Sequence, residues 1–381
     1  MSEWRDSPLG KVATLQRGFD LPARSRRPGK VPIVSSSGVS GWHDRAMVKA
    51  PGVVTGRYGT IGEVFYEEND FWPLNTTLWV SNYHGNDQRF VYYLLQRIDY
   101  AMHSGKSGVP GVNRNDLHGE LVHVPVSVAE QQSISAILKD VDALVSKLER
   151  LIAKKRAIKQ GMMQELLTGR TRLPGYSVSW SETRLGDVAS GGRGAGLSKS
   201  SIVASGRNPC LLYGELFTTY SRVIESVKSF TNEVSGVRSV GGEVLLPGST
   251  TTTAEDLATA SALLQCGVLL GGDVNIIRPN RHKIDSVWLA YYLTNQLKNQ
   301  IAEAGQGITI VHLYVRSLLT LEIELPPLPE QIAIGSALQD ADAEIEALER
   351  RLEATRDIKQ GMMQELLTGR TRLPVDEEVA V

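Results

Sequence analysis

The sequence IKQGMMQELLTGRTRLP occupies residues 158–174 and returns, letter for letter, at residues 358–374. Agreement at the same offset of 200 residues extends backwards, as far as Glu130-Gln131 and Glu330-Gln331. Two copies separated by about one domain's worth of chain indicate a duplication and not a solenoid of many short repeats. We therefore expect two similar halves.

The composition is that of an ordinary globular protein, and 381 residues leave room for two or three domains. The start, MSEWRDSPLG, does not resemble a signal peptide, and no apolar run reaches the length of a membrane span. The two cysteines, Cys210 and Cys266, are isolated and indicate neither a zinc site nor a disulfide framework. These features predict a cytoplasmic protein.

Each copy of the repeat completes a longer helical pattern. Ser127 and Glu130 have the spacing of a capping box, which starts a helix. Apolar residues follow at alternating steps of four and three, as in a coiled coil: Ile134, Leu138, Val141, Val145, Leu148 and Ile152. Gly169 is a candidate C-cap. The two predicted helical segments span 126–174 and 326–374, and about 42 helical residues would extend roughly 60 Å.

Globular regions at 1–125 and 175–325 precede the two helices. Short segments such as VPIV and GVVT, separated by turn residues, predict strands, and one helix is expected at Asp87–Met102. The regions open alike, with Trp4 and Trp180. They also close alike, because Tyr92-Tyr93-Leu94 recurs as Tyr291-Tyr292-Leu293. A short acidic tail, 375–381, is expected to be disordered.

The order of elements is globule, helix, globule, helix. Basic residues outnumber acidic ones in 126–175 and the reverse holds in 326–381, so the helices are suited to pack on each other. Parallel packing would need a long connection that the sequence lacks. We predict an α+β fold in which two similar mixed α/β domains are separated by two long antiparallel coiled-coil helices, with pseudo-twofold symmetry.

The repeated segment is identical in its two copies, whereas the globular regions agree only at scattered positions. A surface that must fit the same partner twice stays the same, and spare apolar residues on the segment indicate a docking site for another protein. The predicted docking residues are Ile158, Met162, Met163, Leu166, Leu167, Ile358, Met362, Met363, Leu366 and Leu367. The alternative is that Met163 and Leu167 pack on the chain's own globular domains.

The whole pattern resembles the DNA-specificity subunit of a type I restriction–modification enzyme. The resemblance covers nearly the whole chain. It is carried by Trp4…Leu9-Gly10 and Trp180…Leu185-Gly186-Asp187 opening each domain, by the Glu-Gln pairs opening each helix, and by LLTGRTRL at 166–173 and 366–373. It implies two target-recognition domains that each read one half of a bipartite site in double-stranded DNA.

The resemblance also implies partners and cofactors. The helices would set the spacer between half-sites and dock two methyltransferase subunits, and two restriction (translocase) subunits would join the complex through them. The chain itself would be non-catalytic and would bind no cofactor, because S-adenosylmethionine, and Mg²⁺ with ATP, would belong to the partner subunits.

Reading bases requires Arg, Lys, Asn, Gln, Ser or Thr on loops that reach a groove edge. In the first domain such residues lie in a basic cluster, a serine turn, the GRYGTIG loop at 56–62 and the Gly-rich stretch 103–114. The candidates are Arg24, Arg26, Arg27, Ser36, Arg57, Tyr58, Lys106, Asn113 and Arg114. A solvated loop, a plain turn and a simple hairpin are the alternatives for the first three groups.

The candidates in the second domain are Arg193, Lys199, Arg207, Tyr213, Thr251, Thr252, Gln306, Thr309 and His312. The last three match the stretch after Gly105. The threonine run 250–253 could equally form an edge strand. The two domains have diverged too far to align these contacts residue by residue.

Enzymatic interpretations find little support in the sequence. Gly105-Lys106-Ser107 resembles the end of a phosphate-binding loop, but Tyr100 stands where that loop needs its first glycine. Methyltransferase signatures and paired histidine ligands are missing from the chain. Two alternatives stay open: a coiled-coil scaffold whose globular domains bind proteins, and a self-sufficient nuclease or methyltransferase. Salt-sensitive binding to a duplex would separate the first from DNA recognition, and an assay of the chain alone would test the second.

Overall fold

The structure is a computed structural model that describes residues 3–104 and 111–373. It divides into two compact units, unit 1 (Met1–Glu149 and Arg350–Val381) and unit 2 (Arg150–Glu349). Each unit thus combines one globular domain with the start of one long helix and the end of the other. Candidate Lys106, the last residue of the second repeat (Pro374) and the acidic tail 375–381 lie outside the described residues.

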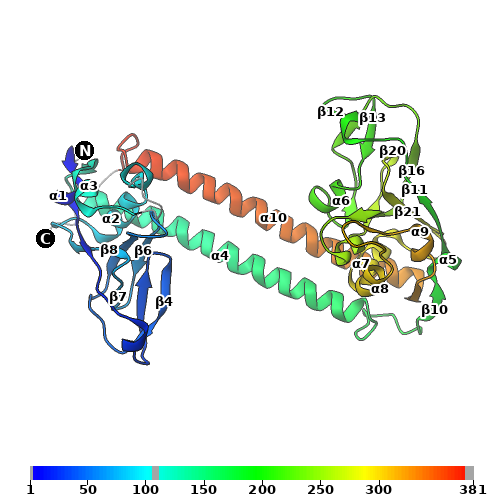
Figure 1. The fold of residues 1–381 in the computed structure, drawn as a ribbon, viewed down its shortest axis with the longest axis horizontal. Coiled ribbons are helices and arrows are strands. Elements are labelled where there is room, and N and C mark those ends of the chain that lie inside the picture. The colour runs from blue at the N-terminus through cyan, green and yellow to red at the C-terminus, as the bar shows by residue number, and fades with distance from the viewer. Residues whose placement is uncertain (1–2, 105–110, 374–381) are drawn as a thin grey trace. The chain divides into compact units, whose positions relative to one another are not determined.

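The two long helices are α4 (Val128–Leu166) and α10 (Leu328–Leu366), drawn in green and orange in Figure 1. At the start of α4 the N–H of Glu130 donates to Ser127 Oγ at 3.4 Å, as the capping spacing predicts. Both helices end before the predicted position. Gly169 and Gly369 follow with positive φ of 65° and 72°, a conformation that glycine adopts without steric cost.

Segments of the two helices lie side by side within each unit. In unit 1, Asp142 pairs with Lys359 at 2.7 Å and Glu149 with Arg356 at 2.6 Å. In unit 2, Lys155 pairs with Glu344 at 2.7 Å and Lys159 with Asp342. Partner numbers fall along one helix as they rise along the other, so the segments run antiparallel, as predicted.

The apolar residues that predicted a continuous coiled-coil seam are buried in two different settings, along the helix and inside the globular domains. Leu148 and Ile152 are buried along α4. Ile134 and Leu138, however, belong to the globular core of unit 1, and Ile334 and Leu338 belong to that of unit 2. The first turns of each helix are therefore part of a domain, because the domain covers their apolar face.

Unit 1 contains a four-stranded sheet in the order β2-β8-β5-β6, a three-stranded sheet β4-β3-β7 and a strand pair β1-β9. Its strands are β1 (Trp4–Pro8), β2 (Thr14–Arg17), β3 (Val31–Ser35), β4 (Gly38–His43), β5 (Gly52–Gly56), β6 (Val64–Glu67), β7 (Trp72–Pro73), β8 (Thr77–Asn82) and β9 (Leu121–Pro125). The four-stranded sheet is antiparallel, and β3 pairs with β7 in parallel.

The other helices of unit 1 are α1 (Leu9–Val12), η1 (Ala23–Ser25), α2 (Gln88–Leu95), η2 (Tyr100–His103) and α3 (Arg114–Gly119). The helix expected at Asp87–Met102 is shorter than predicted. Asp87 caps α2 by accepting from the N–H of Phe90 at 2.7 Å, and the 3₁₀ turn η2 follows separately. Phe90, Leu94 and Leu95 of α2 join the buried core of unit 1.

Unit 2 contains two five-stranded sheets, β11-β21-β17-β19-β14 and β12-β15-β13-β20-β16, and two strand pairs, β10-β23 and β18-β22. Its strands are β10 (Ser181–Arg184), β11 (Ala189–Arg193), β12 (Ile202–Val203), β13 (Asn208–Leu211), β14 (Val223–Ile224), β15 (Ser229–Thr231), β16 (Val237–Val240), β17 (Glu243–Pro247), β18 (Ser249–Thr250), β19 (Ser261–Leu263), β20 (Cys266–Leu270), β21 (Val274–Pro279), β22 (Val311–His312) and β23 (Glu322–Leu325).

The shorter helices of unit 2 are α5 (Leu185–Val188), η3 (Lys199–Ser201), α6 (Glu215–Thr218), η4 (Ala254–Ala258), α7 (Ser286–Asn295), α8 (Lys298–Glu303) and α9 (Val315–Leu318). Trp288 and Tyr291 of α7 are fully buried in the larger core. Both units combine small mixed sheets with short helices and an antiparallel pair of long helical segments, which confirms the predicted fold class.

Candidate functional site

In unit 1, the loop after β5 holds a guanidinium group beside an aromatic ring. The Arg57 guanidinium carbon lies 4.4 Å from the centre of the Tyr58 ring, a cation–π distance. The backbone N–H groups of both residues donate to the carbonyl of Thr76, at 2.8 and 3.1 Å. Tyr58 is 45% exposed. The backbone therefore fixes this pair while its side chains face solvent, as contact with a nucleic acid requires.

A surface hollow joins this pair to the segment before α3. The N–H of Val112 donates to the carbonyl of Arg57 at 3.0 Å. Asn113, the N-cap of α3, lines the hollow together with Arg57 and Tyr58. Arg114 follows as the exposed first residue of α3. The structure thus brings together candidates from two of the predicted loops.

Three more polar residues lie near this hollow. Ser36, in the turn between β3 and β4, has its Oγ 3.7 Å from the place that a Cβ on Gly59 would take. His103 and Asp116 line the hollow, and neither was among the candidates. The sequence offered a weak signal for His103, its place in the Gly-rich stretch 103–114, and none for Asp116.

The basic cluster Arg24, Arg26 and Arg27 lies at the opposite end of the β3–β4 hairpin. Arg27 pairs with Asp44 at 3.0 Å, and its N–H donates to Nδ1 of His43, the last residue of β4. The five residues of β3 span about 16 Å, so this cluster is well separated from Ser36. Arg24 is exposed and Arg26 is half-buried. The structure does not bring these arginines to the hollow.

In unit 2, the strand pair β18-β22 and the residues beside it form a surface that resembles the hollow of unit 1 but has different side chains. We call these two surfaces the junctions of unit 1 and unit 2. Strand β18 pairs with β22, and the N–H of Leu313 donates to the carbonyl of Gly248 at 2.9 Å, as Val112 does to Arg57 in unit 1. Gln306 and His312 exchange two backbone hydrogen bonds, of 2.9 and 2.8 Å. Five candidates therefore gather on this junction: Thr251, Thr252, Gln306, Thr309 and His312. The threonine run is a strand only at Thr250, and Thr251–Thr253 form the turn into η4.

The remaining candidates of unit 2 have mixed settings. Arg193 pairs with Asp273, whose backbone carbonyl accepts from the N–H of Gly248 beside the junction. Lys199 and Arg207 are exposed near β12 and β13. Tyr213 packs against a buried cluster and is only partly exposed. Arg193 thus borders the junction, and the other three lie on separate loops.

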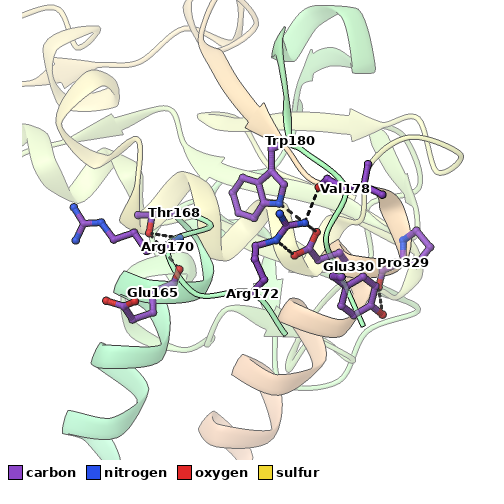
Figure 2. A network of polar contacts seen from close by, with 9 residues as sticks. Glu165, Thr168, Arg170, Arg172, Val178, Trp180, Pro329 and Glu330 are labelled. Atoms are coloured by element: carbon purple, nitrogen blue, oxygen red, sulfur yellow. Dashed lines mark hydrogen bonds and ion pairs between the residues drawn. The ribbon is translucent and has the colours of Figure 1, made fainter. Parts of the chain in front are cut away.

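Each unit also contains a buried carboxylate that holds the end of the repeated segment. In Figure 2, Arg172 donates to both oxygens of Glu330 at 2.5 Å, and Trp180 Nε1 donates to the same carboxylate at 3.2 Å. The Glu330 side chain is fully buried, and its hydrogen bond to Arg172 raises the pKa of that guanidinium. We call this network the clamp of unit 2.

Unit 1 has the same clamp. Arg372 donates to Glu130 at 2.7 and 2.9 Å, and Trp4 Nε1 donates to Glu130 at 3.2 Å. A bidentate guanidinium–carboxylate pair has a fixed geometry as well as a favourable energy. The repeated LTGRTRL sequence therefore ends each helix by fastening it to the domain that the helix enters. The sequence analysis drew attention to both the Glu-Gln pairs and the LLTGRTRL endings, but it did not pair the glutamates with the arginines.

A second duplicated network joins domain and helix. Tyr93 donates to Asp142 at 2.7 Å and Tyr291 donates to Asp342 at 2.5 Å. Burial, and next the hydrogen bond to the aspartate, raise the pKa of both phenols, which keeps them protonated as donors. Tyr93 therefore corresponds to Tyr291. The predicted match of Tyr92-Tyr93 to Tyr291-Tyr292 is wrong by one residue, because the hydrogen bond to the helix and not the letter pattern defines the equivalent position.

The structure divides the predicted docking residues into two groups. Leu166, Leu167, Leu366 and Leu367 are buried in the globular core of their own unit, and the four methionines are partly buried against the same cores. For Met163 and Leu167 the alternative, packing on the chain's own domains, is the arrangement found. The leucines are not accessible to a partner, because each helix ends inside a domain. Ile158 and Ile358 remain 46% and 59% exposed.

In each unit, the end of the long helix and the domain also form an open groove, whose lining does not include the exposed isoleucine. In unit 2 it is lined by Gln160, Met163 and Gln164 together with Asn295 and Gln296 of the domain. In unit 1 the equivalent groove is lined by Gln360, Met363 and Gln364 with Gln96 and Arg97 of the domain. The helix contributes the same three side chains to both grooves, whereas the remaining lining differs, with Thr168 and Arg170 in unit 2 and Arg356 and Lys359 in unit 1.

Neither a cluster of metal ligands nor a membrane-spanning helix occurs among the described residues. Within 3–104 and 111–373, His, Cys, Asp and Glu side chains form no group of three that could hold a metal ion. In the same part of the chain, every helix is too short or too polar to span a membrane.

Comparison with known proteins gives consistent matches. Curated relatives from Methanocaldococcus jannaschii include a protein named as a type I restriction enzyme MjaX specificity subunit, 26% identical over 74% of this chain and 68% of the relative. They also include the MjaVIII specificity subunit, 23% identical over 75% and 71%. The crystal structure of a type I restriction–modification S subunit from M. genitalium aligns over 96% of each chain, with a TM-score of 0.68 and 15% identity.

A second solved structure, from work on complex assembly of the type I restriction–modification system, aligns over 97% of this chain and 98% of its own, with a TM-score of 0.55 and 18% identity. At such identities these likenesses show the fold. The family model of the type I restriction modification DNA specificity domain matches residues 1–160 and 177–356, well over half of the sequence. The chain therefore belongs to the family of type I restriction–modification DNA specificity subunits.

Proposed function

We propose that this chain is the non-catalytic DNA-recognition subunit of a type I restriction–modification complex, in which each domain reads one half of a bipartite, asymmetric site. One observation supports this most directly. The clamps and the tyrosine–aspartate networks are the same in both units, whereas the junction surfaces differ, with Arg57 and Tyr58 in one and threonines in the other. Framework that repeats while exposed loops diverge suits two readers of different base sequences.

Selection of duplexes from a randomised DNA library tests this proposal. The purified chain, together with its methyltransferase subunits, should enrich two short defined segments separated by a fixed gap. Exchanging residues 1–125 for the first domain of another family member should change one segment and leave the other and the gap unchanged. A single continuous motif, or no enrichment at any salt concentration, would contradict the proposal.

We propose that the repeated helix segments, on which Ile158 and Ile358 are exposed, seat two methyltransferase subunits, which would carry S-adenosylmethionine, while restriction subunits with Mg²⁺ and ATP join through them. Replacing the exposed Ile158 by aspartate should weaken binding at one segment by tenfold or more, because an apolar contact is lost and a charge is desolvated. Native mass spectrometry should then show one bound methyltransferase subunit instead of two. Ile158→Asp combined with Ile358→Asp should leave none bound.

An unchanged stoichiometry in both variants would refute the exposed face of the repeated segment as the docking surface. Val178→Asp offers a matched control, because Val178 is an exposed apolar residue of unit 2 outside the repeated segment. It should leave two subunits bound.

We further propose that the paired helices set the gap between half-sites. The unit boundary falls after Glu149 in α4 and after Glu349 in α10, and the helix ion pairs described above lie within one unit or the other. Inserting seven residues at both points should keep these pairs and the heptad phase while adding about 10 Å of helix. The preferred gap should lengthen by about three base pairs.

Library selection with the double-insertion protein measures that change. Insertion into α4 alone is the control, because it removes one helix from register and should lower stability without selecting a new defined gap. If the double insertion leaves the gap unchanged, the helices do not set it.

A further inference from the structure

One apolar side chain in unit 2 projects fully into solvent from the junction. Ile308 is 100% exposed, and Ile310, two residues later, is 45% exposed. Both lie between Gln306 and His312, the two residues whose backbones are hydrogen-bonded to each other. Single exposed apolar residues are common on protein surfaces, so exposure alone does not indicate a function for Ile308. Its position among the polar candidates of the junction is the reason to consider it further.

The backbone that carries Ile308 has a fixed shape. The two hydrogen bonds between Gln306 and His312, at 2.9 and 2.8 Å, close the segment at its base. Gly307 has a φ of +127°, and a Cβ there would lie 2.0 Å from the carbonyl oxygen of Ile310. A larger residue could not replace this glycine without moving the turn. The tip therefore presents Ile308 on a closed turn and not on a loose loop.

Hydroxyl and amide groups surround the base of this turn. Strand β22 ends at His312 and pairs with β18, which leads directly into the exposed Thr251 and Thr252. Thr309 and Gln306 are exposed on the turn itself. These side chains can hydrogen-bond to base edges, but an isoleucine cannot. Any base that Ile308 contacts is therefore contacted through an apolar group.

In the major groove, the 5-methyl group of thymine is the apolar group that distinguishes one base from the others. We propose that Ile308 contacts the methyl group of a thymine in the half-site read by unit 2 and so helps to determine that half-site. This inference rests on the proposed function and adds to it a named residue, base and contact.

Uridine substitution tests the contact. The duplex found by library selection is resynthesised with deoxyuridine in place of each thymine of the unit 2 half-site in turn, which removes one methyl group and keeps all base-pairing groups. At one position the wild-type complex should lose about fourfold in affinity, as expected for one buried methyl group. In Ile308→Ala the same uridine substitution should have no effect, because the side chain that covers the methyl group is gone.

Ile332→Ala is the matched control. Ile332 is 51% exposed on α10 in the same unit and lies outside the junction. It should retain the fourfold response to uridine at the same position. Ile308→Val, which keeps a branched apolar side chain, should retain most of it.

Several outcomes would overturn the contact. One is a wild-type complex that is insensitive to uridine at every thymine, and another is an equal response in wild type and Ile308→Ala. A third outcome uses a duplex that carries 2-aminopurine, a base whose fluorescence rises when it is unstacked, in the unit 2 half-site. A rise that depends on Ile308, together with no effect of uridine, would indicate that Ile308 is inserted between base pairs instead. Failure of the library selection to yield any preferred sequence would refute the proposed function itself.

Discussion

Arg172→Ala is expected to destabilise unit 2 by about 3 kcal/mol, one of the largest effects available to a single substitution in this chain. The guanidinium makes two hydrogen bonds to Glu330, which is fully buried. Removing it leaves a buried carboxylate with Trp180 Nε1 as its remaining donor in the clamp. Urea unfolding of the full-length chain measures the loss, and hydrogen exchange should locate it at residues 168–180 and at the start of α10.

The duplicated clamp supplies unusually close controls. Arg372→Ala should produce the same loss in unit 1, at residues 3–8 and at the start of α4, and leave the exchange of unit 2 unchanged. Arg170→Ala removes an exposed arginine two residues away and should change stability by less than about 0.5 kcal/mol. Adding Glu330→Leu to Arg172→Ala should recover part of the stability, because no buried charge remains. Equal exchange in wild type and Arg172→Ala would mean that the clamp does not hold the segment.

Leu167→Asp is expected to unfold unit 2 or to cost at least about 4 kcal/mol. Leu167 is completely buried in the core that also contains Leu185 and Trp288. A carboxylate at this position would lose its hydration without gaining a partner, in addition to leaving a cavity. Thermal unfolding and near-ultraviolet circular dichroism measure the change.

Ile158→Asp, two and a half turns earlier on the same helix, is the comparison that gives this experiment its meaning. It places the same charge on an exposed position and should leave the unfolding temperature within about 2 °C of wild type. If Leu167→Asp were instead as stable as Ile158→Asp and lost only its methyltransferase partner, the leucine would be a docking residue and not a core residue.

The repeat made the architecture predictable. Identity at a single offset defined two equivalent halves, and the heptad spacing from Ile134 to Ile152 predicted the long helices. What could not be read from spacing was which partner each apolar face would meet. Ile134 and Leu166 have the pattern of seam residues, yet both are buried by a globular domain, because a helix pattern records that a face is covered and not by what.

For the polar networks, the residues themselves were visible in the sequence as repeated positions, but their pairing was not. The two clamps have equivalent members: Trp4 and Trp180, Glu130 and Glu330, Arg372 and Arg172. The sequence therefore contains every member of the clamp twice. The predicted antiparallel packing brings the end of one helix to the start of the other, but it does not indicate which side chains meet there. The tyrosine match failed because the tyrosine that reaches the long helix is the second of its pair in α2 and the first of its pair in α7.

The loop candidates divided according to their distance from the sheets. Arg57, Tyr58, Thr251 and His312 lie on segments tied by backbone hydrogen bonds to a strand or to each other, and these gather into junctions. Arg24 and Arg207 lie on loops whose course depends on long-range packing that local residue patterns do not specify. Their role as DNA contacts stays a prediction.

The duplicated clamp bears on how such genes could acquire new specificities. The glutamate and tryptophan that receive an arginine are the same in both domains, and the arriving segment is the same at the end of both helices. If two genes of this family recombine within the repeat, the incoming domain brings its own glutamate and tryptophan. These residues match the arginine of the repeated segment, so the clamp can form. Recombination can therefore exchange globular domains between related proteins, and the long helices and the clamps need no further substitution.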